Sequence, residues 1–160
     1  MSKSQVWDET KNEFRILGKR HALIDVQALC DHLDSLVGVP VAEVIIHNHE
    51  FHLGKEDAER LHKERQQAAI RDIIDLMIES DRLSGTGLTS VILPDDPSQP
   101  HSVQILNPCT KATRGAAKSL LLSYWAGALS YLFGEEFDLR NVAVDETQNL
   151  LKCDLVRRRV

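Results

Sequence analysis

The sequence lacks the cysteine pattern of a disulfide-bonded domain. Its three cysteines, Cys30, Cys109 and Cys153, are far apart and form no CxxC motif. An odd, scattered set of cysteines is typical of a reducing compartment. The first fourteen residues are mostly polar and show no secretory signal pattern. We therefore expect a cytoplasmic protein.

Three further absences exclude classes of function. The formal net charge is −5, so the chain lacks the basic excess of a general nucleic-acid binder. The longest apolar stretch, 119–133, is shorter than the roughly 20 residues that span a bilayer, so we expect no membrane span. The GTG at 85–87 lacks the third glycine of a dinucleotide-binding fingerprint.

The most informative segment present is an apolar helix within 107–137. Over 116–133 only Lys118, Ser119, Ser123 and Ser130 are polar. A helix that is apolar on nearly every face must be covered on several sides. The sequence leaves open whether a partner subunit, other helices or a bound apolar molecule covers it.

The first half of the chain predicts helices. Asp25 is a typical N-cap for a helix that ends at Gly38 and buries apolar residues at helical spacing: Val26, Leu29, Cys30, Leu33 and Val37. The segment 41–46 is ambiguous but favours helix. Gly54 is interpreted as a break before a solvated, charged helix over 55–67. An amphipathic helix follows over 70–80.

The second half predicts two hairpins around the apolar helix. Strands are expected at 89–93, 101–106, 139–145 and 150–156, and a short one at 15–18. Leu151, Cys153 and Leu155 alternate with polar residues, as in a half-buried strand. We therefore predict one α+β domain over 1–160, with 1–13 loosely ordered. Its antiparallel sheet of about four to five strands is covered by helices, and a β-β-α-β-β half follows the helical segment.

The hairpin, the NP turn, the helix with SYWAGALSYLFG and the closing hairpin with a cysteine together resemble the 4-vinyl reductase family. Those hydrocarbon-binding domains share their fold with trafficking-complex subunits and with aromatic-sensing domains of bacterial transcription activators. The resemblance covers 18–157 and is most specific over 119–134. It implies a homodimer with a buried pocket for an apolar ligand. Family membership does not establish reductase chemistry.

The chain departs from this family at the zinc site of its aromatic-sensing members. The corresponding positions here are Ser119, Asp145 and Cys153. A structural zinc site needs four good ligands, mostly cysteine or histidine, and only one thiol is present. We therefore expect no zinc at that position.

Several residues are candidates for the wall of a ligand pocket. Glycine inside a helix usually has a packing reason, so Gly127 either permits close packing or leaves room for a ligand. The complete set of predicted ligand-binding residues is Tyr124, Trp125, Gly127, Ala128, Tyr131, Ile74, Met77, Lys111 and Arg114. Lys111 and Arg114 precede the apolar helix, where they and the helix N-terminus could hold an anionic group.

Two other groups are weaker candidates. The densest set of potential metal ligands is His47, His49, Glu50 and His52, but no regular structure brings all three histidines together. A polar helix end or turn is therefore the favoured interpretation. Cys109 lies close to Lys111, which would lower the pKa of its thiol and favour a nucleophilic thiolate.

We consider three functions. The first is a non-enzymatic, homodimeric sensor or carrier that binds an apolar or aromatic molecule. The second is an assembly module without a ligand, which predicts an exposed apolar patch. The third is an enzyme that reduces a tetrapyrrole vinyl group, although the chain shows no motif for a hydride-donating nucleotide.

Overall fold

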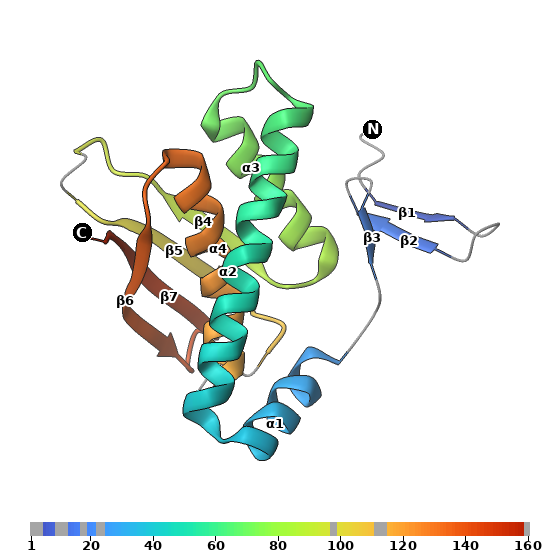
Figure 1. The fold of residues 1–160 in the computed structure, drawn as a ribbon, viewed down its shortest axis with the longest axis vertical. Coiled ribbons are helices and arrows are strands. Elements are labelled where there is room, and N and C mark those ends of the chain that lie inside the picture. Colours follow the sequence, from blue (N-terminus) through green and yellow to red (C-terminus); the bar gives the residue numbers. More distant parts are fainter. Residues whose placement is uncertain are drawn as a thin grey trace.

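A computed structural model describes residues 5–8, 13–16, 19–21, 25–96, 99–110 and 115–158. These residues form seven strands and four helices (Figure 1). The strands are β1 (Gln5–Asp8), β2 (Glu13–Ile16), β3 (Lys19–His21), β4 (Leu88–Ile92), β5 (His101–Leu106), β6 (Phe137–Asp145) and β7 (Leu150–Arg157). The helices are α1 (Val26–Val37), α2 (Val39–Glu64), α3 (Ile70–Ser84) and α4 (Ala116–Phe133).

The main sheet has four antiparallel strands in the order β4-β5-β7-β6. Its buried face follows the period-2 pattern of the sequence, and Val103 in β5 lies opposite Cys153 in β7. On β4 and β5, Leu88, Ile92 and Leu106 alternate with the buried positions and are exposed. An antiparallel sheet can remain stable with one face in water. The predicted α+β class and the two hairpins are confirmed.

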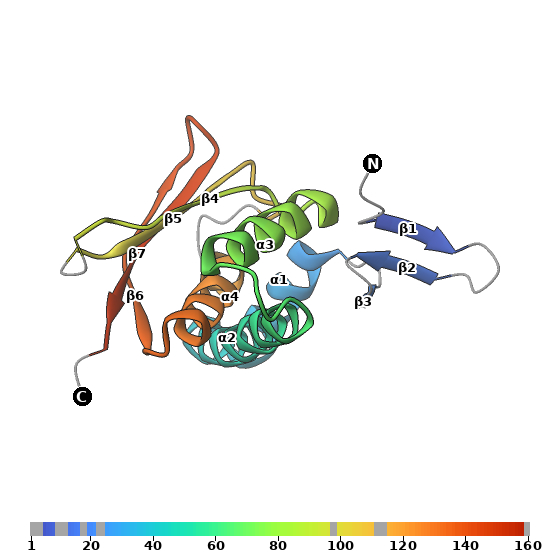
Figure 2. The ribbon, with the colours of Figure 1, turned by 90° about the horizontal axis from the view of Figure 1, so that it is seen from above.

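Helix α4 lies between this sheet and α2 (Figure 2). Twelve of its eighteen residues are buried, including both of the serines that face its neighbours, Ser123 and Ser130. Ser130 donates to the Ala126 carbonyl at 2.7 Å and accepts from the Phe137 amide at 3.0 Å. A second helix of the same chain, α2, therefore supplies most of the cover that this apolar helix requires.

Helix α2 corrects one prediction, and helix α1 corrects another. It is continuous over 26 residues, so Gly54 lies inside a helix and does not end one. The helix α1 begins after the predicted cap, and Asp25 accepts from the Ala28 amide at 2.9 Å. Of the five residues that it was expected to bury, however, only Cys30 is buried, and Leu29 and Val37 are exposed.

The three N-terminal strands form a separate antiparallel sheet in the order β1-β2-β3. Figure 1 shows this sheet beside α3, away from the four-stranded sheet. Strand β1 lies within the segment that was expected to be loosely ordered. Among the described residues, no helix is long and apolar enough to cross a membrane.

Candidate functional site

Helices α2 and α4 cross with their backbones in contact at two glycines. A Cβ atom built on Gly54 would overlap the backbone carbonyl of Tyr124, and one on Gly127 would overlap the carbonyl of Phe51. Gly54 lies three residues after Phe51 on α2, and Gly127 lies three residues after Tyr124 on α4. Each helix therefore contributes one glycine and one carbonyl to the contact. Only glycine lets two helix backbones approach this closely. The crossing fixes the position of Tyr124 and Trp125 relative to α2.

A cavity of about 300 Å³ lies beside this crossing, among α2, α3 and α4. We call it the three-helix pocket. Its lining residues are Glu50, Leu53, Asp57, Ser80, Asp81, Ser84, Thr86, Leu120, Leu121, Tyr124 and Trp125. The wall combines leucines and two aromatic residues with carboxylates and hydroxyl groups. Ligand pockets generally combine an apolar wall with a few such polar groups.

Asp81, in the last turn of α3, is a pocket carboxyl group with a raised pKa. Its Oδ2 atom accepts from Trp125 Nε1 at 2.9 Å and from Thr89 Oγ1 at 2.7 Å. Desolvation raises the pKa of Asp81 from 3.8 to about 6, although these hydrogen bonds favour the charged form. Loss of solvation and the negative end of the helix dipole both disfavour the charged form of an acid near a helix C-terminus. Such groups are concentrated at functional sites.

A second polar contact in the pocket links α4 to α2. The Tyr124 hydroxyl donates to Asp57 Oδ2 at 3.3 Å. Desolvation, followed by the negative charge of Asp57, raises the pKa of Tyr124 well above its ordinary value. Asp57 Oδ1 lies 3.7 Å from Arg60 Nη2 on the same helix. Tyr124 therefore stays protonated and holds the Asp57 carboxylate toward the pocket.

The pocket contains two of the residues that the sequence suggested, Tyr124 and Trp125. Gly127 faces the backbone of α2, and a Cβ on Gly54 would meet the Ala128 amide. Tyr131 makes an edge contact with His62, with ring centroids 6.0 Å apart. Ile74 and Met77 belong to the main core and do not line the pocket. Lys111 and Arg114 lie outside the described residues.

Sequence reasoning missed the pocket carboxylates Asp57 and Asp81, and it weighed Glu50 only as a possible metal ligand beside the histidines. The signal was present in the helical spacing. Asp81 follows the buried Ile74 by seven positions and Met77 by four, so it continues the buried stripe of α3. Glu50, Gly54 and Asp57 lie on one face of α2 in the same way. An acidic residue on a buried stripe is a better site candidate than one on a charged face.

The predicted anion site at the N-terminus of α4 is occupied by a side chain of α1. Asp34 Oδ1 accepts from the Ala116 amide at 3.3 Å. Gly115 has a φ of +71°, and a Cβ there would overlap the Asp34 carboxylate. A carboxylate is favourable at the positive end of a helix. This contact joins α1 to α4 and places a negative charge where an anionic ligand was expected.

The three histidines do not converge. His47 Nδ1 lies 2.8 Å from Ser123 Oγ, whereas His49 and His52 are exposed on α2. Desolvation lowers the pKa of His47, and the charge of Arg158 acts in the same direction. Among the described residues, no group of three or more His, Cys, Asp or Glu side chains could hold a metal ion.

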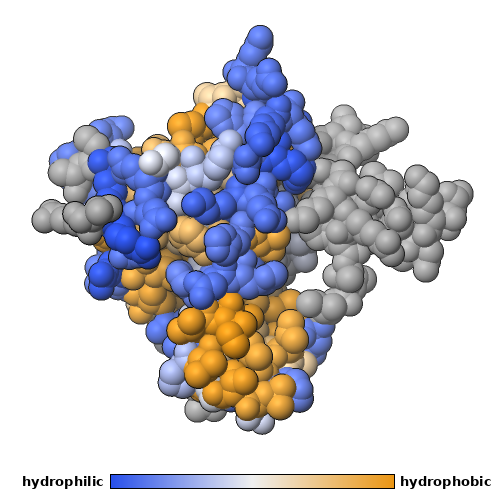
Figure 3. Space-filling model, in the orientation of Figure 1, coloured by the Kyte–Doolittle hydropathy of each residue, from blue (hydrophilic) through white to orange (hydrophobic). Residues whose placement is uncertain are grey.

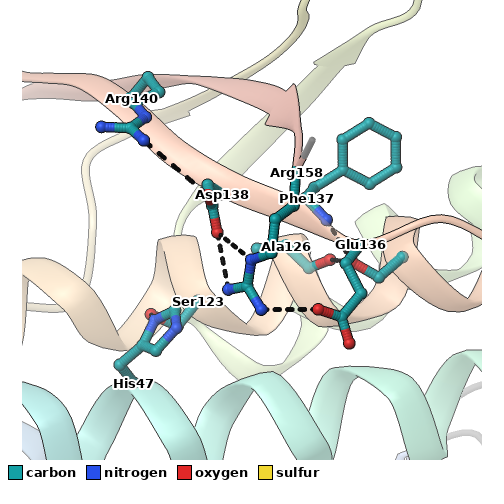
Figure 4. Close-up of polar contacts among 9 residues, drawn as sticks. His47, Ser123, Ala126, Glu136, Phe137, Asp138, Arg140 and Arg158 are labelled. Carbon is teal, nitrogen blue, oxygen red and sulfur yellow. Dashed lines mark hydrogen bonds and ion pairs between the residues drawn. The ribbon is translucent and has the colours of Figure 1, made fainter. Parts of the chain in front are cut away.

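The His47–Ser123 pair resembles part of a catalytic triad but lacks the other features of one. Figure 4 shows Asp138 directed to Arg158 and Arg140, and not to the histidine. Ser123 is 0% exposed. A serine nucleophile must reach its substrate, and its histidine needs a group that orients it. The pair therefore joins α2 to α4 as a polar contact in the helix interface.

The positions that correspond to the family zinc site come from three different elements. Ser119 lies on α4, Asp145 ends β6, and Cys153 is buried in β7. Desolvation raises the pKa of the Cys153 thiol to about 12. Desolvation also raises the pKa of Cys109, which is opposite to the direction that a nucleophilic thiolate requires.

Comparison with known proteins identifies the fold. The chain superposes on the phenol-responsive sensory domain of the transcription activator PoxR, crystallised with phenol. The TM-score is 0.72 at 14% identity, over 96% of this chain and 84% of that chain. It also superposes on a trafficking protein particle complex subunit 3 from Naegleria fowleri that is covalently bound to palmitic acid. That TM-score is 0.54 at 8% identity, over 84% of this chain and 91% of that chain.

No protein-family model matches the sequence, and no curated protein matches it. The fold relationships implied by the sequence resemblance, to aromatic-sensing domains and to trafficking subunits, are confirmed. The narrower assignment to the 4-vinyl reductase family is not. At these levels of identity the superpositions establish the fold alone.

Proposed function

We propose that this domain binds a compact small molecule in the three-helix pocket. The observation that supports the proposal most directly is the pocket itself, which Tyr124, Trp125 and the desolvated Asp81 all line. The likeness to a phenol-responsive sensory domain is consistent with this function. Tyr124 and Trp125, two of the three aromatic residues that the sequence predicted for the ligand wall, line this pocket.

The ligand class follows from the size and the lining of the pocket. A volume of about 300 Å³ lies at the lower end of the usual range of ligand pockets, about 300–1,000 Å³. It suits a molecule with a single aromatic ring. Leu53, Leu120 and Leu121 provide apolar contact, worth about 25 cal/mol per Å² of buried surface before ordering costs. The carboxylates accept hydrogen bonds, so the polar end of the ligand carries a donor.

Filling the pocket tests this function. Leu53→Trp places a large ring in the pocket, and its matched control is His52→Trp at the adjacent, exposed position of α2. We expect phenol and toluene to bind the wild type in calorimetric titrations. We expect Leu53→Trp to weaken that binding by about tenfold or more and His52→Trp to leave it unchanged.

Native mass spectrometry of freshly purified protein is an independent measurement of the same proposal. We expect a bound small molecule that is lost in Leu53→Trp and kept in His52→Trp. A wild type that carries no ligand and binds no aromatic probe would rule out the proposed function.

A second function is favoured by an exposed apolar surface that we call the α1–α2 patch. Figure 3 shows apolar residues gathered over α1 and the start of α2. The members of the patch are Leu29, Leu36, Val37, Val39, Val41, Val44 and Ile45, each 42% to 65% exposed. Their combined exposed area is on the order of 600 Å², the upper end for the largest patch of a monomer.

We propose that a second copy of the chain covers the α1–α2 patch. Each partner in a standard interface buries about 800 Å², and obligate homodimer interfaces are the more apolar ones. The patch supplies most of that area without a charged residue among its members. A homodimer is compatible with ligand binding because the two surfaces use different parts of α2. The assembly function and the sensor function are therefore combined in one proposal.

Two predictions from the sequence remain without support from the geometry. Reduction of a tetrapyrrole vinyl group rests on the family resemblance alone. A cytoplasmic location rests on the three cysteines, all of which are free thiols. Absorbance spectra of the purified protein with an added porphyrin and NADPH would test the enzymatic alternative directly. A spectral change that requires NADPH would support it.

A further inference from the structure

The charge lining the three-helix pocket is negative. Glu50, Asp57 and Asp81 all line it, and no lysine, arginine or histidine does so among the described residues. Arg60 lies outside the lining, and its guanidinium is shared between Asp57 at 3.7 Å and Glu64 at 3.2 Å. A cavity with low-dielectric walls and charge of one sign concentrates ligands of the opposite sign. This negative charge therefore disfavours the binding of an anionic ligand.

Asp81 is the carboxylate that lacks compensation by a cation. Its side-chain partners in the described part of the chain are the Trp125 indole N–H and the hydroxyl groups of Thr89 and Thr86, which are all neutral. Desolvated charges in proteins are generally paired with an opposite charge or a metal. Here the carboxylate lines a cavity, and the hydrogen bonds from Trp125 and Thr89 both end on Oδ2.

Aromatic residues lie next to this carboxylate. Tyr124 and Trp125 are consecutive on α4, line the same pocket and have ring centroids 6.1 Å apart with the planes at 85°. A cation beside the carboxylate gains Coulomb attraction, and one that also lies over the face of an aromatic ring gains cation–π attraction of about 0.5–2 kcal/mol. A neutral hydroxyl gains only a hydrogen bond to the carboxylate.

We propose that the three-helix pocket selects a protonated amine on a small aromatic or apolar body, and that Asp81 binds its ammonium group. The apolar body contacts the leucines, and the ammonium group lies at the acidic side of the pocket. This inference rests on the proposed function, because it names the ligand class of the same pocket. It also assigns Asp81 as the residue that determines specificity.

Three probes of nearly the same shape test the charge preference: benzylamine, benzyl alcohol and benzoate. We expect calorimetric titration at roughly pH 8, where carboxylates and the amine are both charged, to rank benzylamine first and benzoate last. Benzylamine should bind at least about tenfold more tightly than benzyl alcohol.

Substitution of the carboxylate separates this proposal from the more general one. Asp81→Asn keeps the shape and an acceptor for Trp125, and it should lower the affinity for benzylamine to about that for benzyl alcohol in the same variant. Asp75→Asn, on an exposed position of the same helix, is the control for loss of one negative charge. Asp57→Asn provides a second test of the charge if Asp81→Asn does not fold.

The outcomes distinguish the two proposals. If the wild type binds benzyl alcohol as tightly as benzylamine, the ammonium proposal is wrong and the pocket remains a neutral ligand site. Tightest binding of benzoate would overturn it as well. If none of the probes binds and toluene and phenol do not bind either, the proposed function itself fails.

Discussion

At the residue scale, Asp81 is a group whose charged form lowers the stability of the fold. The Oδ2 atom accepts two hydrogen bonds, yet desolvation outweighs them and raises the pKa to about 6. The raised pKa means that the folded state holds this proton more tightly than the unfolded state does. Charging the group at neutral pH therefore costs the fold about 3 kcal/mol relative to acid pH.

This cost gives a pH-dependence with a defined sign. The relative stability is fully present below the unfolded pKa of 3.8 and is lost as pH rises through about 6. Asp81→Asn removes the titration, so its unfolding free energy should improve relative to the wild type between roughly pH 4 and 7 and then stay level. Urea unfolding of both proteins at a series of pH values measures the difference, with Asp75→Asn as the charge control. A constant difference over that range would contradict the raised pKa.

At the scale of elements, the crossing of α2 and α4 determines where the pocket lies. Gly54 and Gly127 allow the backbones to touch, which brings Tyr124 within hydrogen-bonding distance of Asp57. The polar pair His47–Ser123 joins the same two helices at 2.8 Å. A larger residue at Gly127 would disturb this crossing whichever function is correct. Substitution by leucine at that position therefore does not distinguish ligand binding from assembly.

The crossing makes a prediction about stability. Gly54→Ala and Gly127→Ala each insert a methyl group against a backbone carbonyl that cannot rotate away, so each should lower the unfolding free energy by about 1–3 kcal/mol. The double variant should lose less than the sum, because either methyl group already separates the helices. Chemical unfolding at neutral pH measures all three. Stabilities within about 0.5 kcal/mol of wild type would show that the helices are not in such close contact.

The element scale also shows where sequence periodicity succeeds. The strands of the second half and the N-cap at Asp25 agree with the structure because their signals are local: a period of two, and a side chain bonding three residues ahead. The prediction that Gly54 ends a helix was wrong because it also used local information alone. A glycine that ends a helix and a glycine that packs against another helix are identical in the local sequence.

At the scale of the whole molecule, the two proposed functions use different parts of α2. The first turns contribute to the α1–α2 patch, and the middle of the helix lines the three-helix pocket. A ligand that shifts α2 would therefore act on the proposed dimer surface through one continuous helix. The arrangement suits a sensor in which binding and association are linked.

The proposed homodimer is tested by its association in solution. Val44 is 59% exposed within the patch, so Val44→Glu should place a desolvated charge in the interface and yield a monomer. His52→Glu adds the same side chain to an exposed position of α2 outside the patch, and it should leave the dimer intact. Light scattering after gel filtration over a concentration series measures the mass. A wild type that remains monomeric throughout would rule out a second copy on this surface.

The sequence by itself determined the class of the fold and most of its elements. The sequence shows directly the alternation of apolar and polar residues over 101–106 and 150–156 and the apolar composition of 116–133. These local patterns predict which elements form and which faces are covered. It also placed Tyr124 and Trp125 on a wall of the pocket. These results need only the geometry of a strand or a helix.

Tertiary structure alone decided what covers α4 and which charges meet. Glu50, Asp57 and Asp81 come from two helices, and their proximity to Trp125 depends on the crossing angle and the contact distance between elements. The same applies to the patch, since Leu29 and Val37 have the spacing of buried residues and yet are exposed. Burial is a property of the neighbours that a residue acquires, and a helical period specifies a face without specifying what packs against it.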